Sequence, residues 1–214
     1  VSVTDPVTAR AHLEIVDLAE ERSTRLTLDE GDDFGAVWSP DGSRVLFMRT
    51  NEQGIGLWTK PVDGATAERQ LRPPSPRELL YPLSWSPDGE RILLFSLPGG
   101  ALPSGLWILP ASGAGDPVRY TDSRGNGDIG WFSPDGRCLA AGGLDGCLTV
   151  WGFRDGQQPS RESVTISQGL VWVGFDGDRH TLSGVSLAAH PELPELVGRR
   201  WAVPGLRVND TATT

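Results

Sequence analysis

The sequence is poor in several residue types and has no long apolar segment. Its 214 residues include two cysteines, one methionine and one lysine, and no apolar run approaches the roughly 18 residues that a membrane-spanning helix requires. The first ten residues have neither a basic start nor an apolar stretch, so they do not resemble a signal peptide. The sequence therefore predicts no membrane span and favours the cytoplasm, unless a leader has been lost from a chain that begins with Val1.

Positive charge is also scarce. The net charge is -9 with a sequence pI near 4.8, because 28 Asp and Glu outnumber 19 Lys and Arg. A protein that binds nucleic acid through its phosphates needs a basic surface that releases counterions, and this composition supplies none. The charge therefore argues against a nucleic-acid partner, and otherwise indicates only a solvated surface.

The two cysteines are predicted to be buried free thiols. If Asp145 and Gly146 form a two-residue turn, Ala141 faces Val150 and Cys138 lies near Phe153. At roughly 3.3 Å per residue, this arrangement puts Cys138 about 20 Å from Cys147, too far for a disulfide. The pair also lacks the further Cys or His ligands of a zinc site.

Catalytic signatures are missing as well. There is no Gly-x-Ser-x-Gly motif, P-loop, dinucleotide-binding glycine pattern or His-Glu-x-x-His, and the three histidines have no spacing that suggests a triad. The acidic run from Asp29 to Asp33 offers four carboxylates to a cation such as calcium, but its spacing is not that of an EF-hand. We therefore expect no enzymatic activity and no cofactor, and the acidic run leaves cation binding open.

What the sequence does contain is a repeated motif. It stands at residues 37–42 (Val-Trp-Ser-Pro-Asp-Gly), 84–89 (Ser-Trp-Ser-Pro-Asp-Gly), 131–136 (Trp-Phe-Ser-Pro-Asp-Gly) and, degraded, 172–177 (Trp-Val-Gly-Phe-Asp-Gly). Its Asp residues are 47, 47 and 41 positions apart, a period at which one unit forms one small sheet of a β-propeller. Pro presets φ in such a turn, Asp caps it, and Gly adopts the left-handed conformation.

Each unit is predicted to form four antiparallel strands. In the first complete unit these are Phe34–Trp38, Ser43–Thr50, Ile55–Pro61 and Ala65–Leu71, separated by turn residues. The Asp and Arg that flank each turn, such as Asp41 and Arg44, are expected to pair across the hairpin, and the eight tryptophans are expected to fill the space between neighbouring sheets.

The two ends depart from this pattern. His12–Leu18 and Arg25–Leu28 match a third and fourth strand with no first and second strand before them. Near the other end, a proline-rich segment at Ala188–Val197 interrupts the last unit. Exchange of strands between these ends would close a ring of about five blades, and the alternative is an open partial propeller.

The predicted organisation is one domain. We expect an all-β, four-stranded-blade propeller over residues 11–206, with a half blade at 11–28, blades at about 34–71, 81–121, 128–166 and 170–203, and flexible tails at 1–10 and 207–214.

The motif followed by a basic residue and an apolar strand, as in Arg44-Val45-Leu46-Phe47 and Arg91-Ile92-Leu93-Leu94-Phe95, resembles the TolB-type, WD40-like propeller repeat. The segment from Leu139 to Trp151 is closer to a true WD repeat. The resemblance covers about Leu13 to Val203. It implies a propeller fold and a range of roles, including protein-complex scaffolds, envelope proteins, sensor domains and the gating domain of prolyl-oligopeptidase-like peptidases. The repeat has no catalytic residues to transfer.

Loops that lead into the first strand of each unit share a face with the loops between second and third strands. Partner-binding residues are predicted on that face, because loops on a rigid propeller usually carry its function. The candidates are Asp32, Asp33, Asn51, Gln53, Arg77, Glu78, Tyr81, Arg124, Asn126 and Asp128.

Mixed charge with a tyrosine on this face suits a protein or peptide partner more than a small molecule. The sequence thus predicts a non-catalytic interaction scaffold or sensor module, part of a larger protein or assembly. The alternative is the gating propeller of a serine peptidase whose catalytic domain lies outside this chain.

Overall fold

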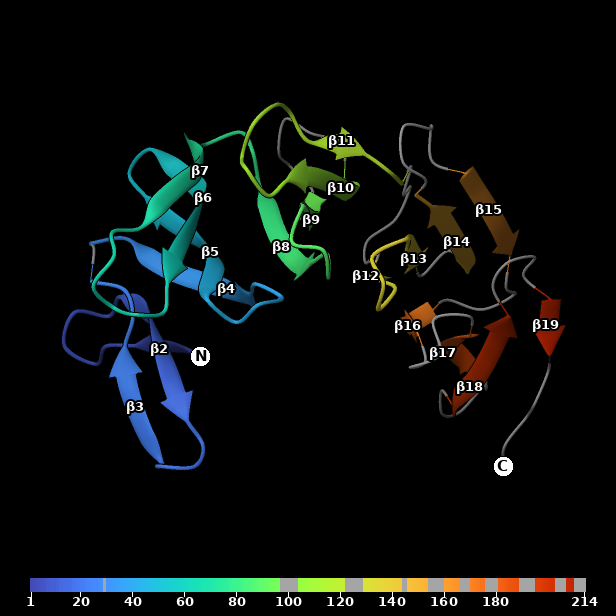
Figure 1. Ribbon diagram of the computed structural model, residues 1–214, viewed down its shortest axis with the longest axis horizontal. Helices are drawn as coiled ribbons and strands as arrows, with labels where there is room; N and C mark the ends of the chain where they lie inside the picture. The colour runs from blue at the N-terminus through green and yellow to red at the C-terminus, as the bar shows by residue number, and fades with distance from the viewer. Residues whose placement is uncertain are drawn as a thin grey trace. The chain divides into compact units, whose positions relative to one another are not determined.

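The structure, a computed structural model, is built from β-strands alone in the residues it describes. These are residues 1–28, 30–96, 104–121, 129–143, 146–153, 160–165, 170–175, 181–188, 195–202 and 207–209. The strands form five sheets, and every strand pairing that is defined is antiparallel (Figure 1). The expected all-β class is confirmed.

The sheets follow one another along the chain, and each consists of consecutive strands. The first sheet has three strands, β1 (Ser2–Thr4), β2 (Ala11–Asp17) and β3 (Arg22–Arg25). The second sheet has four, β4 (Asp32–Trp38), β5 (Arg44–Asn51), β6 (Gly54–Pro61) and β7 (Arg69–Ser75). The third sheet has β8 (Leu80–Trp85), β9 (Arg91–Ser96), β10 (Gly105–Pro110) and β11 (Val118–Arg119).

Two further four-stranded sheets complete the described chain. The fourth consists of β12 (Ile129–Phe132), β13 (Cys138–Gly142), β14 (Cys147–Gly152) and β15 (Ser160–Thr165). The fifth consists of β16 (Leu170–Phe175), β17 (Thr181–Ala188), β18 (Glu195–Ala202) and β19 (Arg207–Asn209). Four-stranded antiparallel sheets were predicted for each repeat, and the strands begin and end within a few residues of their expected limits.

The largest displacement is in the outer strand of the second sheet. The sequence predicts Ala65–Leu71, whereas β7 runs from Arg69 to Ser75. Asp63 explains the difference, because its Oδ1 accepts hydrogen bonds from the backbone N–H groups of Ala65 and Thr66 and its Oδ2 from the Thr66 hydroxyl. This cap holds the chain in a turn and delays the start of the strand.

The segments predicted as tails contain short strands, and of the two alternatives for the chain ends the described strands show no exchange. Residues 2–4 form β1, which pairs with β2, and residues 207–209 form β19, which pairs with β18. Among the described strands, no sheet mixes elements from the two ends of the chain. β1 extends the predicted half blade to a three-stranded sheet, and β19 completes the fifth sheet as its fourth strand.

The chain forms two compact units. The first holds residues 1–85, 89–103 and 107–118, and the second holds residues 86–88, 104–106 and 119–214. Within the first unit, a core cluster lies between the second and third sheets and includes Leu46, Met48, Leu57, Leu80 and Leu94. A second cluster joins the first sheet to the second through Leu13, Leu26, Val45 and Phe47. The prediction of one domain over residues 11–206 stays a prediction.

The Ser-Pro-Asp-Gly turn is organised by its serine as much as by its aspartate. Ser39 is buried; its hydroxyl donates to Asp41 Oδ1 (2.6 Å) and accepts from the backbone N–H of Arg44 (3.0 Å). Gly42 adopts φ +68°. Ser133 makes the same contacts, to Asp135 Oδ1 (2.6 Å) and from the N–H of Cys138 (2.8 Å). The capping role predicted for Asp and the conformation predicted for Gly are confirmed, while the role of Ser was not foreseen.

The predicted pairing of Asp41 with Arg44 is wrong. Asp41 accepts hydrogen bonds from Ser39 and Ser43. The guanidinium carbon of Arg44 lies 5.4 Å from the ring centre of Trp85, a cation–π contact with the next sheet. The hydroxyls of Ser39 and Ser43 donate hydrogen bonds to the Asp41 carboxylate. Arg44 therefore does not pair with Asp41 and lies over the ring of Trp85 instead.

We expect Asp41 to make the free energy of unfolding decrease as the pH falls. Hydrogen bonds from Ser39 and then from Ser43 lower the pKa of Asp41 from 3.8 to about 2. A carboxyl whose pKa is lowered on folding stabilises the fold above its ordinary pKa, and this contribution is lost as the pH falls from about 4 to about 2. In urea unfolding, we expect Asp41→Asn to be less stable than the wild type at pH 6, with a difference that shrinks towards pH 2.5. Glu52→Gln at the exposed β5–β6 turn is the control, and a pH-independent difference for Asp41→Asn would contradict the assignment.

Consecutive Ser-Pro-Asp-Gly turns also touch one another. A Cβ added to Gly89 would lie 3.7 Å from Cγ of Pro40, in the preceding turn. A Cβ added to Gly136 would lie 3.2 Å from Oδ2 of Asp88 and 3.6 Å from Cδ of Pro87. Only the approach at Gly136 is tighter than an ordinary van der Waals contact, so a side chain there would require Asp88 to shift.

The prediction that the tryptophans pack between sheets holds for only some of them. Trp85, Trp107 and Trp151 are buried, and Trp58 is half-buried against the second core cluster. Trp38 and Trp131 are exposed, which contradicts the prediction. Trp131 is exposed because it is not equivalent to Trp85: Phe132 precedes the serine of its motif and occupies the buried position. The side chains of Trp172 and Trp201 lie outside those described.

Neither cysteine forms a disulfide, as predicted, although both are half-buried rather than buried. The ladder pairs Cys138 with Gly152 and Ala141 with Thr149, one residue away from the predicted register. The turn is longer than expected and places Gly146 at φ +74°. Burial, and then the nearby charge of Asp135, raises the pKa of the Cys138 thiol.

Candidate functional site

Most of the predicted partner-binding residues that the structure describes lie at one end of the first unit. We call this the strand-start end, because β4 and β8 begin there and β5 turns into β6 there. Asp32 pairs with Thr50 in the ladder, which places it beside Asn51 and the turn, while Ile55 pairs with Ser75, just before Arg77. Asn51, Gln53 and Arg77 are exposed.

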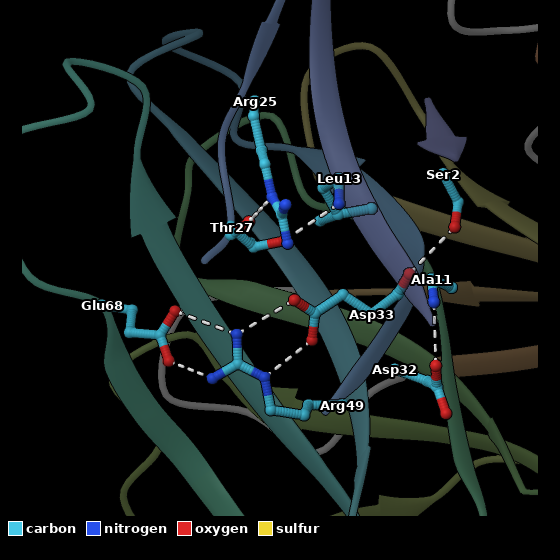
Figure 2. Close-up of polar contacts among 9 residues, drawn as sticks. All are labelled: Ser2, Ala11, Leu13, Arg25, Thr27, Asp32, Asp33, Arg49 and Glu68. Atoms are coloured by element: carbon cyan, nitrogen blue, oxygen red, sulfur yellow. Dashed lines mark hydrogen bonds and ion pairs between the residues drawn. The ribbon is translucent and has the colours of Figure 1, made fainter. Parts of the chain in front are cut away.

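Asp33 is the exception, and its prediction as a partner-binding residue is wrong. The residue is only 1% exposed. Its Oδ1 and Oδ2 accept hydrogen bonds from Nε (2.7 Å) and Nη2 (3.0 Å) of Arg49 on the neighbouring strand β5 (Figure 2). The carboxylate is therefore committed to an internal ion pair and faces no partner.

Arg49 is bound on its other side by Glu68. Nη1 of Arg49 donates to Oε1 of Glu68, and Nη2 donates to Oε2 at 3.1 Å (Figure 2). The guanidinium carbon lies 5.3 Å from the ring centre of Phe47 and 5.2 Å from that of Trp58. Two carboxylates and two aromatic rings thus hold a buried arginine between the inner strand β4 and the start of the outer strand β7.

The charge of Arg49 is stabilised despite its burial. Burial acts to lower the pKa of the guanidinium, but the hydrogen bonds that it donates to Asp33 and Glu68 outweigh this effect and raise the pKa above its ordinary value. Both fork–fork pairs are charge-assisted, the geometry in which arginine binds carboxylates most strongly. The cluster of Asp33, Arg49 and Glu68 is therefore a structural clamp within the second sheet.

Neither Arg49 nor Glu68 was among the residues predicted from the sequence. A signal was present nonetheless, because Arg49 interrupts an apolar strand directly opposite an aspartate. The equivalent positions 47 residues later are Leu80 and Ser96, both buried. A comparison of the two repeats at these positions would have shown an ionic pair in one sheet where the other has none.

Two residues of the acidic run, Asp32 and Asp33, accept hydrogen bonds from the first sheet. Asp32 Oδ1 accepts the backbone N–H of Ala11 (2.8 Å), and the Ser2 hydroxyl donates to the backbone carbonyl of Asp33 (2.9 Å), so the start of β4 is fastened to β1 and β2 (Figure 2). Asp29 lies outside the described residues. Within the part of the chain that is described, no group of three His, Cys, Asp or Glu is arranged to hold a metal ion.

Glu78 takes part in a second arginine cluster. Both of its carboxylate oxygens accept from Nη2 of Arg72, at 3.1 and 3.0 Å. Nη1 of Arg72 reaches Gly115 O (3.4 Å) and Asp116 Oδ1 (3.5 Å) beyond β10. Glu78 therefore helps to connect the outer strand of the second sheet with the third sheet, and has less freedom to meet a partner than its neighbour Arg77.

Tyr81 is placed by a β-bulge. Gly35, at φ +66°, lies in the irregular stretch between Phe34 and Val37, and a Cβ added there would lie 3.3 Å from the ring of Tyr81. The ring lies against bare backbone, and about a third of the residue remains exposed. Only glycine combines this conformation with so close an approach.

The remaining predicted residues, Arg124, Asn126 and Asp128, lie outside the described residues. Of the predicted residues, Asp32, Asn51, Gln53, Arg77 and Tyr81 are described at the strand-start end and belong to neither arginine cluster, and we call them the strand-start surface.

Comparison with solved structures identifies the fold. The chain is similar to TolB from Acinetobacter baumannii, with a TM-score of 0.67 and 16% identity over 97% of this chain and 51% of that one. It is also similar to a putative TolB from Agrobacterium tumefaciens, with a TM-score of 0.63 and 20% identity over 92% of this chain and 72% of that one. The fold is a TolB-like β-propeller. At these identities the likeness concerns the fold, and the chain spans about half the length of the first TolB.

The same propeller fold occurs in an enzyme. Oligogalacturonate lyase from Vibrio parahaemolyticus matches with a TM-score of 0.65 and 12% identity, over 89% of this chain and 57% of that one. No family model and no curated protein sequence matches the chain. In the described portion of the propeller, no helix has the length and apolar character needed to cross a membrane.

Proposed function

We propose that this propeller is a non-catalytic module that binds a protein or peptide through its strand-start surface. The observation that carries the proposal is that the buried and the exposed polar residues at that end have different surroundings. Buried charges are engaged by one another, whereas Asn51, Gln53 and Arg77 are exposed and the ring of Tyr81 packs on Gly35.

This combination matches the chemistry of protein interfaces. Tyrosine and arginine are enriched among the residues that dominate binding energy, and a ring that is already immobilised loses little entropy when a partner covers it. The clamp around Arg49 supports the same surface from below, because it fixes β4 and β5 where they meet the β5–β6 turn. The TolB-type resemblance, which implies scaffold and sensor roles among others, supports a binding role over a catalytic one.

The alternative, a gating propeller for a serine peptidase, makes a different prediction about the gene. A coding segment for an α/β-hydrolase with a nucleophile motif next to this one would support gating, and a kinase or other signalling segment would support the sensor role.

The proposal is tested with the variant Asn51→Ala/Gln53→Ala/Arg77→Ala/Tyr81→Ala. A partner captured by cross-linking to the wild type, and identified by mass spectrometry, is expected to bind this variant at least about 30-fold more weakly, since loss of a tyrosine and an arginine at a hot spot removes about 2 kcal/mol or more. The matched control, Glu20→Ala/Glu21→Ala, changes exposed residues at the opposite end of the first sheet. Equal affinity for the two variants, measured by calorimetry, would argue against the strand-start surface.

A further inference from the structure

A proline-rich segment lies at the outer edge of the second sheet and leads into the strand-start surface. Its sequence over residues 72–77 is Arg-Pro-Pro-Ser-Pro-Arg. Among the described strands, β7, which contains the first four of these residues, pairs only with β6. Proline has no backbone N–H, so this edge is poorly suited to the addition of another strand. A partner that binds here must therefore recognise the side chains of the segment.

The segment bulges away from β6. Three residue steps along β7, from Arg72 to Ser75, lie opposite two steps along β6. Gly56 is buried beneath this bulge, and a Cβ there would lie 3.0 Å from the nitrogen of Pro74 and 3.2 Å from its Cδ. Pro74 thus packs on the bare backbone of β6, which turns it away from solvent.

Exposure along the segment follows a period of three. Pro73 and Pro76 are exposed, whereas Pro74 and Ser75 between them are half-buried. A β-strand alternates with a period of two, while a polyproline II helix has three residues per turn. Each proline ring fixes its own φ near about -65° and holds the preceding residue in an extended conformation. Pro73 and Pro76 therefore form two neighbouring ridges on one exposed face.

Side chains at both ends of the segment hold it in place. The Ser75 hydroxyl accepts hydrogen bonds from the backbone N–H groups of Arg77 (3.1 Å) and Glu78 (3.3 Å). Arg72 Nη2 donates to both carboxylate oxygens of Glu78, so an ion pair joins the residues on either side of the ridges. Arg77 is exposed directly after Pro76. A segment that is ordered before it binds loses little conformational entropy when a partner covers it.

We propose that Pro73 and Pro76 are recognised by the partner of the strand-start surface, and that this partner is a protein domain with an aromatic-lined groove and an acidic residue beside it. The aromatic rings of the groove receive the two proline ridges, and the acidic residue pairs with Arg77. The inference rests on the proposed function, because it names the kind of partner. It adds two prolines that the strand-start surface does not contain.

The probe is a panel of labelled SH3 and WW domains whose ligands combine prolines with arginine, since such domains bind polyproline II segments through aromatic grooves. By fluorescence anisotropy, we expect the full chain to bind at least one member with a Kd below about 0.5 mM. Pro73→Ala/Pro76→Ala should weaken this binding at least about tenfold, and Arg77→Glu at least about fivefold. The matched control is Pro40→Ala/Pro87→Ala, which removes two exposed prolines of the Ser-Pro-Asp-Gly turns and should leave the Kd within about twofold.

Three results would overturn the inference. The first is an absence of binding by every domain of the panel at about 1 mM chain. The second is binding of a free peptide of residues 70–80 but not of the chain, which would mean that the folded protein does not present the ridges. The third is equal affinity of Pro73→Ala/Pro76→Ala and the wild type for the domain that binds.

The partner captured by cross-linking separates this inference from the proposed function. If that partner binds the fourfold variant of the strand-start surface weakly but binds Pro73→Ala/Pro76→Ala as tightly as the wild type, the strand-start surface stands and the proline ridges are not its recognition element. If the fourfold variant binds as tightly as the wild type, the proposed function fails, and the inference about its partner fails with it. Circular dichroism checks that each variant is folded, which the exposure of the substituted residues favours.

Discussion

Replacing Arg49 by alanine is expected to lower the free energy of unfolding by about 3–5 kcal/mol. The substitution leaves the carboxylates of Asp33 and Glu68 close together without the cation that they share, and Asp33 has almost no access to water. It also removes the group that lies against Phe47 and Trp58. Urea unfolding followed by far-ultraviolet circular dichroism measures the change.

A second variant tests whether the stability depends on the ionic cluster itself or only on the volume of its side chains. Asp33→Leu/Arg49→Met/Glu68→Gln removes all three charges and keeps much of the volume, in the manner of the third sheet, where Leu80 and Ser96 occupy the equivalent positions of Asp33 and Arg49. Replacement of a whole buried ionic cluster by apolar residues is often neutral or stabilising, so this variant should stay within about 2 kcal/mol of the wild type. A loss below about 1 kcal/mol for Arg49→Ala, or equal losses for both variants, would refute the clamp.

Gly54→Ala is expected to destabilise the protein by about 3–5 kcal/mol, through backbone strain and a backbone clash together. Gly54 has φ +119°, a conformation open to glycine almost alone. A Cβ there would lie 2.3 Å from the carbonyl carbon of Ser75 and 2.5 Å from the nitrogen of Pro76. Neither atom can move without shifting the chain that leads to Arg77 and Tyr81.

The control for this variant is Gly64→Ala. Gly64 also has a positive φ, +71°, but a Cβ there would meet nothing within 4 Å, so its substitution should cost only about 1 kcal/mol. Thermal and urea unfolding of the two variants, side by side, isolate the clash from the dihedral strain. Similar losses in both would mean that the approach of β6 to the end of β7 is looser than the structure has it.

The repeat motif carried most of the information about the fold. A turn that needs Pro, Asp and Gly at fixed positions, with apolar strands around it, can be recognised without knowing what it packs against, because its causes are local. The sequence was less informative about strand limits and register, because these depend on turn lengths and side-chain hydrogen bonds that the motif does not specify. Asp63 delays β7, a longer turn shifts the Cys138 ladder, and three residues at each end pair with the neighbouring strand, where strand exchange was one of two alternatives.

The site was harder to predict because its side chains meet partners that are distant in the sequence. Asn51, Gln53 and Arg77 were correctly placed in exposed loops, since loop position follows from strand order. Whether a charged residue faces water or a buried partner does not follow from strand order, so Asp33 was misjudged and Arg49 was overlooked. Trp38 is a similar case, because the exposure of a ring depends on what the neighbouring sheet brings to it.

The serine of the Ser-Pro-Asp-Gly turn has a consequence for how such a chain evolves. Every defined backbone ladder closes within a single sheet, and each of the two turns described above is fastened by contacts among residues no more than five positions apart. A DNA segment that runs from one motif to the next therefore encodes the parts of its own hairpin, and duplication in frame adds a blade without breaking a ladder already present. What a new copy must acquire by later mutation is only its fit to the blades on either side, and the differences between Asp33 with Arg49 and Leu80 with Ser96 are the kind of change by which two copies become distinct.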